Sequence, residues 1–192
     1  MRKNVSTKKR IIIFLALALV GTFIFGFFTV NSKFPASKKT IHPYGQPFTY
    51  QNVKLQIKGK EILDYNQFAD NEDLLRILNI DSTSQNSDTT KIILISVEFY
   101  NPTAKAQVLD LTAFHLESGG FSLQFDYPLM LHYNHCGMNL KLNGNEKKTL
   151  SMPVPLTKIN FSESEWLTIN NRKFSVVYSL YPEKNIAETE HV

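Results

Sequence analysis

The chain has 192 residues, a formal net charge of +4 and a pI near 9.0, enough for one folded domain beside a membrane segment. Five of its 21 Lys and Arg residues lie within residues 1–10, so residues 11–192 hold 16 basic and 17 acidic side chains. That balance lacks the basic surface that nucleic acids require, and we expect no nucleic acid among the partners.

A single cysteine, Cys136, excludes an intramolecular disulfide. The 14 Phe and 8 Tyr residues, with many Leu, Ile and Val, can supply the apolar core that must then hold the domain together. A disulfide between two copies of the chain stays open.

The uncharged run at residues 11–30 predicts a single transmembrane helix. Twenty helical residues rise about 30 Å, the thickness of a bilayer's hydrocarbon core. Residues 1–10 are basic and contain no acid, so we expect this tail in the cytoplasm and the chain after Val30 outside the cell. The lipid bilayer, contacted through residues 11–30, is the first predicted partner.

A secretory signal has the same order of segments, and the best cleavage position here follows Ser32. The apolar core of such a signal usually has roughly 7–15 residues. The longer run in this chain favours an uncleaved signal anchor, and a cleaved signal is the alternative. Because no cysteine lies near Val30, a lipid-anchored lipoprotein is excluded.

Residues 31–47 are expected to form an extracytoplasmic stalk, because three prolines and three lysines disfavour helix and sheet. Residues 48–182 then show strand patterns. Phe48–Ile62 alternates apolar and polar residues, with a bend expected at Gly59. A short helix is predicted from a cap at Asp70 to Leu78.

A polar loop is expected at residues 79–90, before the strongest strand of the chain, Lys91–Tyr100. Both faces of this strand are apolar at its start, and it ends at Asn101-Pro102. Its inward-facing row is expected to be Ile93, Ile95, Val97 and Phe99. The remaining expected elements are strands at Gln107–Leu116, Phe121–Asp126, Leu140–Leu142 and Lys148–Val154 (an edge strand because of Pro153 and Pro155), a turn at residues 143–146, a hairpin of Trp166–Ile169 with Lys173–Tyr181, and a flexible tail at residues 183–192.

These patterns predict a mainly β fold, an antiparallel immunoglobulin-like β-sandwich of seven or eight strands with one short helix. Three runs, ILISVEFYNPT, AFHLESGG and NGNEKKTLSMPVP, follow a recognisable plan of a core strand and two turns. Over roughly Tyr50–Tyr181 the chain resembles the telokin-like sandwich domains of uncharacterised membrane-anchored or secreted proteins of Gram-positive bacteria. The resemblance implies a fold and an envelope location, and it carries no catalytic residues.

One segment, from His132 to Cys136, carries side chains that bind zinc or copper. On a strand His132 and His135 would point to opposite faces, so a metal site or a Cys–His nucleophile there would need a loop or helix. A polar loop with a half-buried thiol is the favoured interpretation. Glu163 and Glu165 form a carboxylate pair that could act on wall sugars, but their polar setting favours solvation.

An apolar run with few charges contains Tyr127, Leu129 and Tyr133. Core or a strand crossing between sheets is the favoured interpretation, and an exposed partner surface is the alternative. We therefore expect a non-enzymatic, membrane-anchored extracytoplasmic domain that binds an envelope protein or cell-wall component, with no cofactor and no metal. The alternative function is an extracytoplasmic hydrolase or metal-binding protein that uses His132–Cys136.

Overall fold

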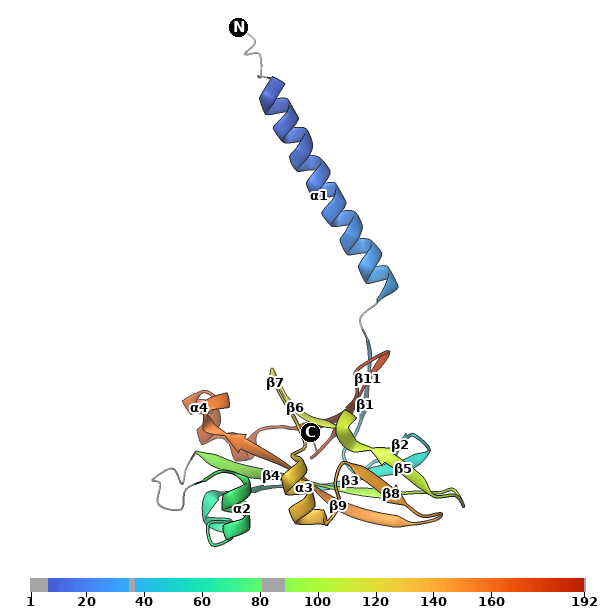
Figure 1. The fold of residues 1–192 in the computed structure, drawn as a ribbon, viewed down its shortest axis with the longest axis vertical. Helices are drawn as coiled ribbons and strands as arrows, with labels where there is room; N and C mark the ends of the chain where they lie inside the picture. The colour runs from blue at the N-terminus through green and yellow to red at the C-terminus, as the bar shows by residue number, and fades with distance from the viewer. Residues whose placement is uncertain (1–6, 35–36, 81–88, 192) are drawn as a thin grey trace. The chain divides into compact units, whose positions relative to one another are not determined.

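The computed structural model describes residues 7–34, 37–80 and 89–191 (Figure 1). It divides into two compact units, residues 1–38 and residues 39–192, which are described in turn.

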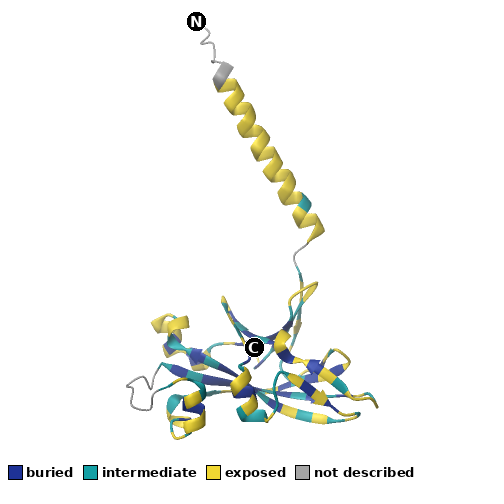
Figure 2. Cartoon of the chain, viewed as in Figure 1, coloured by how far each residue is buried: buried dark blue, intermediate teal, exposed yellow. Residues whose placement is uncertain are grey.

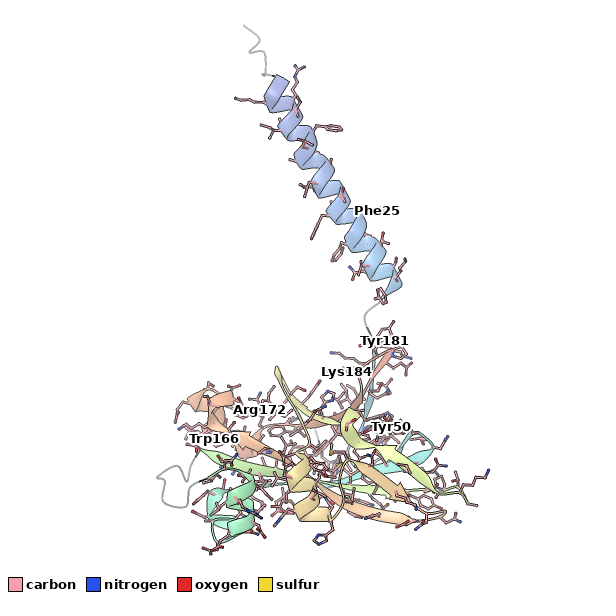
Figure 3. All side chains as sticks on the ribbon, viewed as in Figure 1. Phe25, Tyr50, Trp166, Arg172, Tyr181 and Lys184 are labelled. Carbon is pink, nitrogen blue, oxygen red and sulfur yellow. The ribbon has the colours of Figure 1, made fainter. Side chains whose placement is uncertain are left out.

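The first unit is the helix α1 (Thr7–Lys33). Its apolar side chains are exposed on all sides (Figures 2 and 3), and Phe23 and Phe25 are each 74% exposed. The hydroxyls of Thr22 and Thr29 donate to backbone carbonyls four residues earlier, at 2.9 and 2.8 Å. Residues 9–33 are therefore long and apolar enough to cross a bilayer, by length and composition.

The second unit contains β-sandwich-like sheets. Strand order is β1-β11-β10-β6-β7 in a five-stranded sheet, β2-β3-β4-β9 in a four-stranded sheet and β5-β8 in a two-stranded sheet. The strands are β1 (Lys38–His42), β2 (Phe48–Tyr50), β3 (Val53–Leu63), β4 (Thr90–Tyr100), β5 (Gln107–Asp110), β6 (His115–Ser118), β7 (Phe121–Gln124), β8 (Asn139–Leu142), β9 (Lys147–Thr157), β10 (Ser175–Ser179) and β11 (Glu183–Glu188). The helices are α2 (Glu72–Ile77), α3 (Tyr127–Asn134) and α4 (Glu163–Leu167), with short 3-10 turns η1 (Tyr65–Gln67), η2 (Leu111–Ala113), η3 (Lys158–Asn160) and η4 (Ile169–Asn171).

The main core lies between the sheets, and β4 and β9 contribute four buried side chains each. The predicted inward row is confirmed: Ile93, Ile95, Val97 and Phe99 are all buried. The opposite face is apolar at the start of β4, as predicted, because Ile92 packs in a second core with residues of α2 and α3. Between Ile57 and Gly59 the register of β3 with β4 shifts, which confirms the expected bend.

A buried asparagine, Asn101, closes the end of β4. Its amide donates to the carbonyls of Lys105 and Asn143, both at 2.8 Å. Its oxygen accepts from the amide and hydroxyl of Thr103, at 3.0 and 2.8 Å. The predicted turn at 143–146 therefore packs beside the Asn101-Pro102 turn, and one side chain holds both.

The edge position of β9 is confirmed, because β9 ends the order of the four-stranded sheet. Pro153 and Pro155 pair with Leu94 and Ile92 of β4 and do not break the strand, which continues to Thr157. A proline in an edge strand costs no ladder bond when its missing N–H would have faced away from the neighbouring strand.

Several predictions of helix and strand were wrong. The domain has three short α-helices in its described residues instead of one, and eleven strands instead of seven or eight. Residues 127–134 form α3, because the Asp126 carboxylate accepts from the amide of Leu129 at 2.9 Å and a proline lies in the first turn. The cap of α2 is Asn71 instead of Asp70.

The expected strand Gln107–Leu116 is two strands in different sheets. Asp110 accepts from the amide and the hydroxyl of Thr112, at 2.9 and 2.6 Å, and so bends the chain into η2. Trp166–Ile169 is helical instead of extended, because Ser162 and Glu165 form a capping box at the start of α4.

Both ends of the domain were also mispredicted. The expected stalk, residues 31–47, contains the end of α1 and the strand β1, and the expected flexible tail, residues 183–192, contains β11. Val176 of β10 pairs with Ala187, which is fully buried, so the tail belongs to the five-stranded sheet. Leu180, expected to face inward, is 56% exposed. The expected loop at 79–90 falls mainly on residues 81–88, outside the described residues.

Candidate binding site

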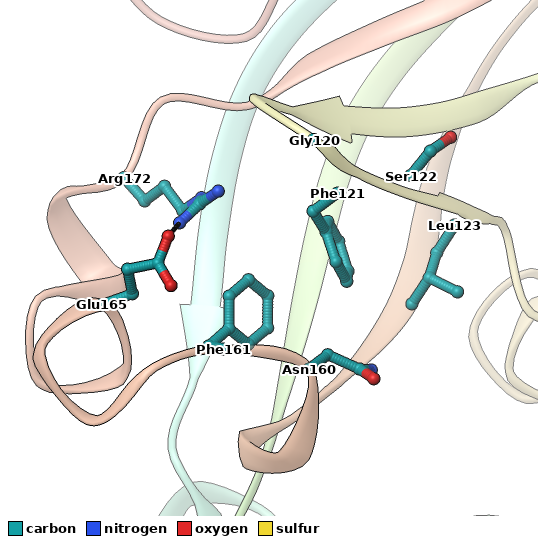
Figure 4. A pocket seen from close by; sticks show the side chains of 8 residues that line it. All are labelled: Gly120, Phe121, Ser122, Leu123, Asn160, Phe161, Glu165 and Arg172. Carbon is teal, nitrogen blue, oxygen red and sulfur yellow. Dashed lines mark hydrogen bonds and ion pairs between the residues drawn. The ribbon is translucent and has the colours of Figure 1, made fainter.

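A pocket of about 400 Å³ lies between the hairpin strand β7 and the segment that runs from η3 to α4 (Figure 4). This volume falls within the roughly 300–1,000 Å³ typical of small-ligand sites. Its lining residues are Gly120, Phe121, Ser122, Leu123, Asn160, Phe161, Glu165 and Arg172.

The capping box of α4 fixes the carboxylate of the pocket. Glu165 Oε2 accepts from the amide and the hydroxyl of Ser162, at 2.9 and 2.8 Å. Its other oxygen, Oε1, accepts from Nη1 of Arg172 at 2.8 Å. The side chain of Glu165 is thus held in one orientation by partners on both sides.

Arg172 joins this helix to the β6–β7 hairpin. Its Nε donates to the hydroxyl of Ser118 at 2.8 Å, and its Nη2 donates to the carbonyl of Ser118 at 2.9 Å. The guanidinium also lies over the ring of Phe161, 5.2 Å from the ring centroid. Arg172 bonds Ser118, which lies 54 positions earlier in the sequence, and Glu165 of α4. It therefore connects the wall of the pocket formed by the β6–β7 hairpin to the wall formed by α4.

The ionised form of the Glu165 side chain is strongly favoured. The hydrogen bond from Arg172, followed by those from Ser162, lowers the pKa of Glu165 to about 2. The carboxylate is therefore ionised at neutral pH, and the Glu165–Arg172 pair is neutral as a unit.

Aromatic rings form the apolar part of the pocket. Figure 4 shows the rings of Phe121 and Phe161 pointing toward one another, and their centroids are 4.7 Å apart. Behind them lies Trp166, only 2% exposed, with its ring 5.9 Å from that of Phe161. Trp166 is the only tryptophan of the chain; it lies in α4, and Figure 3 shows it near Arg172.

The partner surface of Tyr127, Leu129 and Tyr133, the alternative interpretation of this run, is not assembled. Tyr127 is 54% exposed, but Leu129 is completely buried in the second core, and Tyr133 packs against the same core. Burial, then the nearby charge of Glu61, raises the pKa of Tyr133. The side chain of Leu129 faces inward because α3 lies over the outer face of β4, so the three residues form no common exposed surface.

The segment from His132 to Cys136 is the last turn of α3 and the residues after it. His135 has left-handed backbone angles at the helix end, and Cys136 packs partly against the main core. Among the described residues, no group of three or more His, Cys, Asp or Glu side chains is arranged to hold a metal ion. The structure thus supplies no support for the alternative that uses these residues.

Of the residues weighed from sequence, only Glu165 lines the pocket, and its neighbour Glu163 pairs with Lys158 at 3.0 Å instead. Sequence reasoning missed Phe121, Phe161 and Arg172 as site residues. The Ser-x-x-Glu spacing of residues 162–165 is the local signal that could have located the wall formed by α4.

Comparisons with solved structures find several similar proteins of low identity. An uncharacterised β-sandwich protein from Clostridium difficile has 8% identity and a TM-score of 0.43, over 80% of this chain and 96% of that one. A conserved hypothetical protein from Bacillus anthracis has 13% identity and a TM-score of 0.46, over 78% and 95%. A functionally unknown protein from Listeria monocytogenes has 7% identity and a TM-score of 0.45, over 77% and 82%.

None of the curated proteins matches the sequence. The family model described as "Domain of unknown function (DUF5028)" matches residues 45–185, which include every strand of the second unit except β1 and the end of β11. Because this match spans well over half of the chain, the protein belongs to the DUF5028 family.

Proposed function

We propose that the protein is a non-enzymatic binding domain, held at the outer face of the cell membrane by α1 and exposing residues 39–192 to the cell envelope. The observation that carries this proposal is the exposure of α1: residues 9–33 form an apolar helix with no side chain of its spanning window buried by the rest of the described chain. An apolar surface of that size in water is unfavourable, and a bilayer removes it.

The basic residues before α1 support an orientation with the domain outside, because Lys and Arg next to a spanning helix are retained on the cytoplasmic side. We include in the proposal the immunoglobulin-like arrangement of the sandwich, which the five-stranded and four-stranded sheets around the main core support.

A binding role, rather than catalysis, is supported by the state of Glu165. A general acid or base works best with a pKa near the working pH. The pKa of Glu165 is held at about 2, and no second carboxylate lines the described pocket. The pocket therefore presents fixed hydrogen-bonding groups and aromatic faces, which suit recognition.

Carbonate extraction of membranes and the intact mass of the retained protein together test whether α1 is an uncleaved membrane anchor. Membranes of cells expressing the chain are washed with alkaline carbonate, and the retained protein is weighed by mass spectrometry. We expect a membrane-retained chain of 22.0 kDa, with or without its first methionine. A soluble product that begins at Lys33 would instead identify residues 1–32 as a cleaved signal and remove the anchor from the proposal.

A further inference from the structure

The Arg172–Glu165 pair leaves hydrogen-bonding capacity at the pocket. A guanidinium has five N–H donors. In the described residues three of them are engaged, one on each nitrogen, with Ser118 and Glu165. One N–H on Nη1 and one on Nη2 therefore have no described partner, and Glu165 Oε1 accepts a hydrogen bond only from Arg172.

Because donors and an acceptor lie side by side, the pair matches a ligand group that both donates and accepts. Hydroxyl groups on adjacent carbons have this property. An anionic group does not, since the Glu165 carboxylate would repel it and the positive charge of Arg172 is already neutralised.

The apolar wall has the complementary shape for the rest of such a ligand. The side chains of Phe121 and Phe161 line the pocket, and Leu123 continues this wall along β7. A pyranose ring has one face of C–H groups and a rim of hydroxyls, so the face can stack on an aromatic ring while the rim reaches polar side chains. Asn160, exposed on the far side of Phe161 from Arg172 (Figure 4), has an amide oxygen without a described donor.

We propose that this pocket binds a neutral sugar ring of a glycan, with its C–H groups packed against the side chains of Phe161 and Phe121 and its hydroxyls bonded to the Arg172–Glu165 pair and to Asn160. The inference rests on the proposed function only in placing the pocket outside the cell. It names a ligand class that the fold and the family do not supply.

Trp166 makes the site directly observable. It is the only tryptophan, and it lies against Phe161, so its fluorescence responds to changes at this wall of the pocket. The full chain is placed in lipid nanodiscs, because glycoside detergents would compete with sugars. Three neutral tetrasaccharides are titrated: β-1,4-linked N-acetylglucosamine, cellotetraose and maltotetraose.

We expect a saturable change of Trp166 emission with at least one tetrasaccharide, and the preferred one distinguishes a wall-type glycan from a soluble glucan. Phe161→Ala and Asn160→Ala each weaken binding by about tenfold or more, which is the size of effect that losing one packing or polar contact produces. The matched controls are Leu167→Ala on α4 and Ile159→Ala, whose side chains are 74% and 91% exposed and do not line the pocket.

Because Phe161 also packs against Trp166, its variant is accepted only if its thermal midpoint stays close to that of the wild type; Asn160, whose side chain bonds only Thr157, gives the independent test. Poly(glycerol phosphate) and a neutral unstructured peptide are titrated in parallel. Glu165→Gln makes the pocket positive, so it weakens sugar binding and strengthens anion binding.

Saturable binding of poly(glycerol phosphate) to the wild type in place of a tetrasaccharide, binding of the peptide alone, or no response to any tetrasaccharide would overturn the sugar assignment. None of these results would alter the carbonate extraction or the intact mass, so failure of the ligand and failure of the anchor are separate outcomes.

Discussion

Gly144 is the position where one added methyl group should damage the domain most clearly. A Cβ built on Gly144 would lie 2.2 Å from the carbonyl oxygen of Ala104 and 2.5 Å from its carbonyl carbon. These are backbone atoms, and the segment that carries them is held on both sides: Asn101 bonds Lys105, and the amide of Asn145 donates to Thr103 at 3.0 Å.

The cost of Gly144→Ala follows from those contacts. Inserting one methyl group into a packed site typically costs about 1–3 kcal/mol, and a lost backbone hydrogen bond adds about 1 kcal/mol. We therefore expect a loss of about 2–4 kcal/mol in unfolding free energy. For a domain of this size each kcal/mol lowers the melting temperature by roughly 2–4 °C, so the midpoint should fall by about 5–15 °C.

Gly120→Ala is the matched control, because no atom lies within 4 Å of its Cβ position. Its unfolding free energy should stay within about 1 kcal/mol of the wild type. Thermal unfolding of the full chain in nanodiscs, followed by circular dichroism and Trp166 fluorescence, measures both. Equal midpoints for the two variants would refute the packing of the two turns.

Three further changes have defined outcomes. Asn101→Asp directs a carboxylate at the carbonyls of Lys105 and Asn143, so the urea midpoint should fall by an amount equivalent to more than about 3 kcal/mol. The low pKa of Glu165, about 2, makes a contribution to stability that is present above its ordinary value of 4.5 and is lost as the pH falls toward 2, which urea midpoints in wild type and Glu165→Gln should reveal. Burial lowers the pKa of His42 below 6.5, so the unfolded chain takes up the proton more readily and urea midpoints should fall just below pH 6.5, above the range in which carboxylates titrate, but not in His42→Phe.

Each of these has a contrary result. A urea midpoint for Asn101→Asp close to that of the wild type would mean that the buried amide network is not formed. If the urea midpoints of wild type and Glu165→Gln fall in parallel as the pH is lowered, the contact between Glu165 and Arg172 does not stabilise the ionised carboxylate. A fall below pH 6.5 that persists in His42→Phe would assign the titration to another group.

Elements with a regular two-residue period were predictable from sequence. The inward row of β4 and the bend at Gly59 depend on the alternation of neighbouring residues, and the structure confirms both. The turn at 143–146 was predictable because its residue types are turn formers. The exact fit of Gly144 against Ala104 was not, since it depends on a loop about forty positions away.

The short helices were missed because their sequences show capping residues but no hydrophobic periodicity. Asp126 with a following proline, and Ser162 with Glu165, start helices of eight and five residues, which are too short for a hydrophobic period to develop. The strands β1 and β11 were missed because their pairing depends on the fold: β1 pairs with β11 across most of the length of the domain, and β11 also pairs with β10.

The pocket was beyond sequence reasoning for a similar reason. Arg172 reaches Ser118 from a position 54 residues away, and Phe161 meets Phe121 from 40 residues away. The spacing of these residues in the sequence does not predict that they are in contact. Glu165 was noticed as a carboxylate, but its role depends on Arg172, which only the fold brings to it.

The central claim, that α1 spans the membrane with the domain outside, is tested most directly by labelling single cysteines in intact cells. Two variants are made in a Cys136→Ser background: Ile159→Cys, at a side chain that is 91% exposed, and Asn4→Cys, in the basic tail. With a membrane-impermeant maleimide, the account predicts that position 159 is labelled in intact cells and position 4 only after lysis. Labelling of position 4 but not 159 in intact cells, or of neither before lysis, would contradict it.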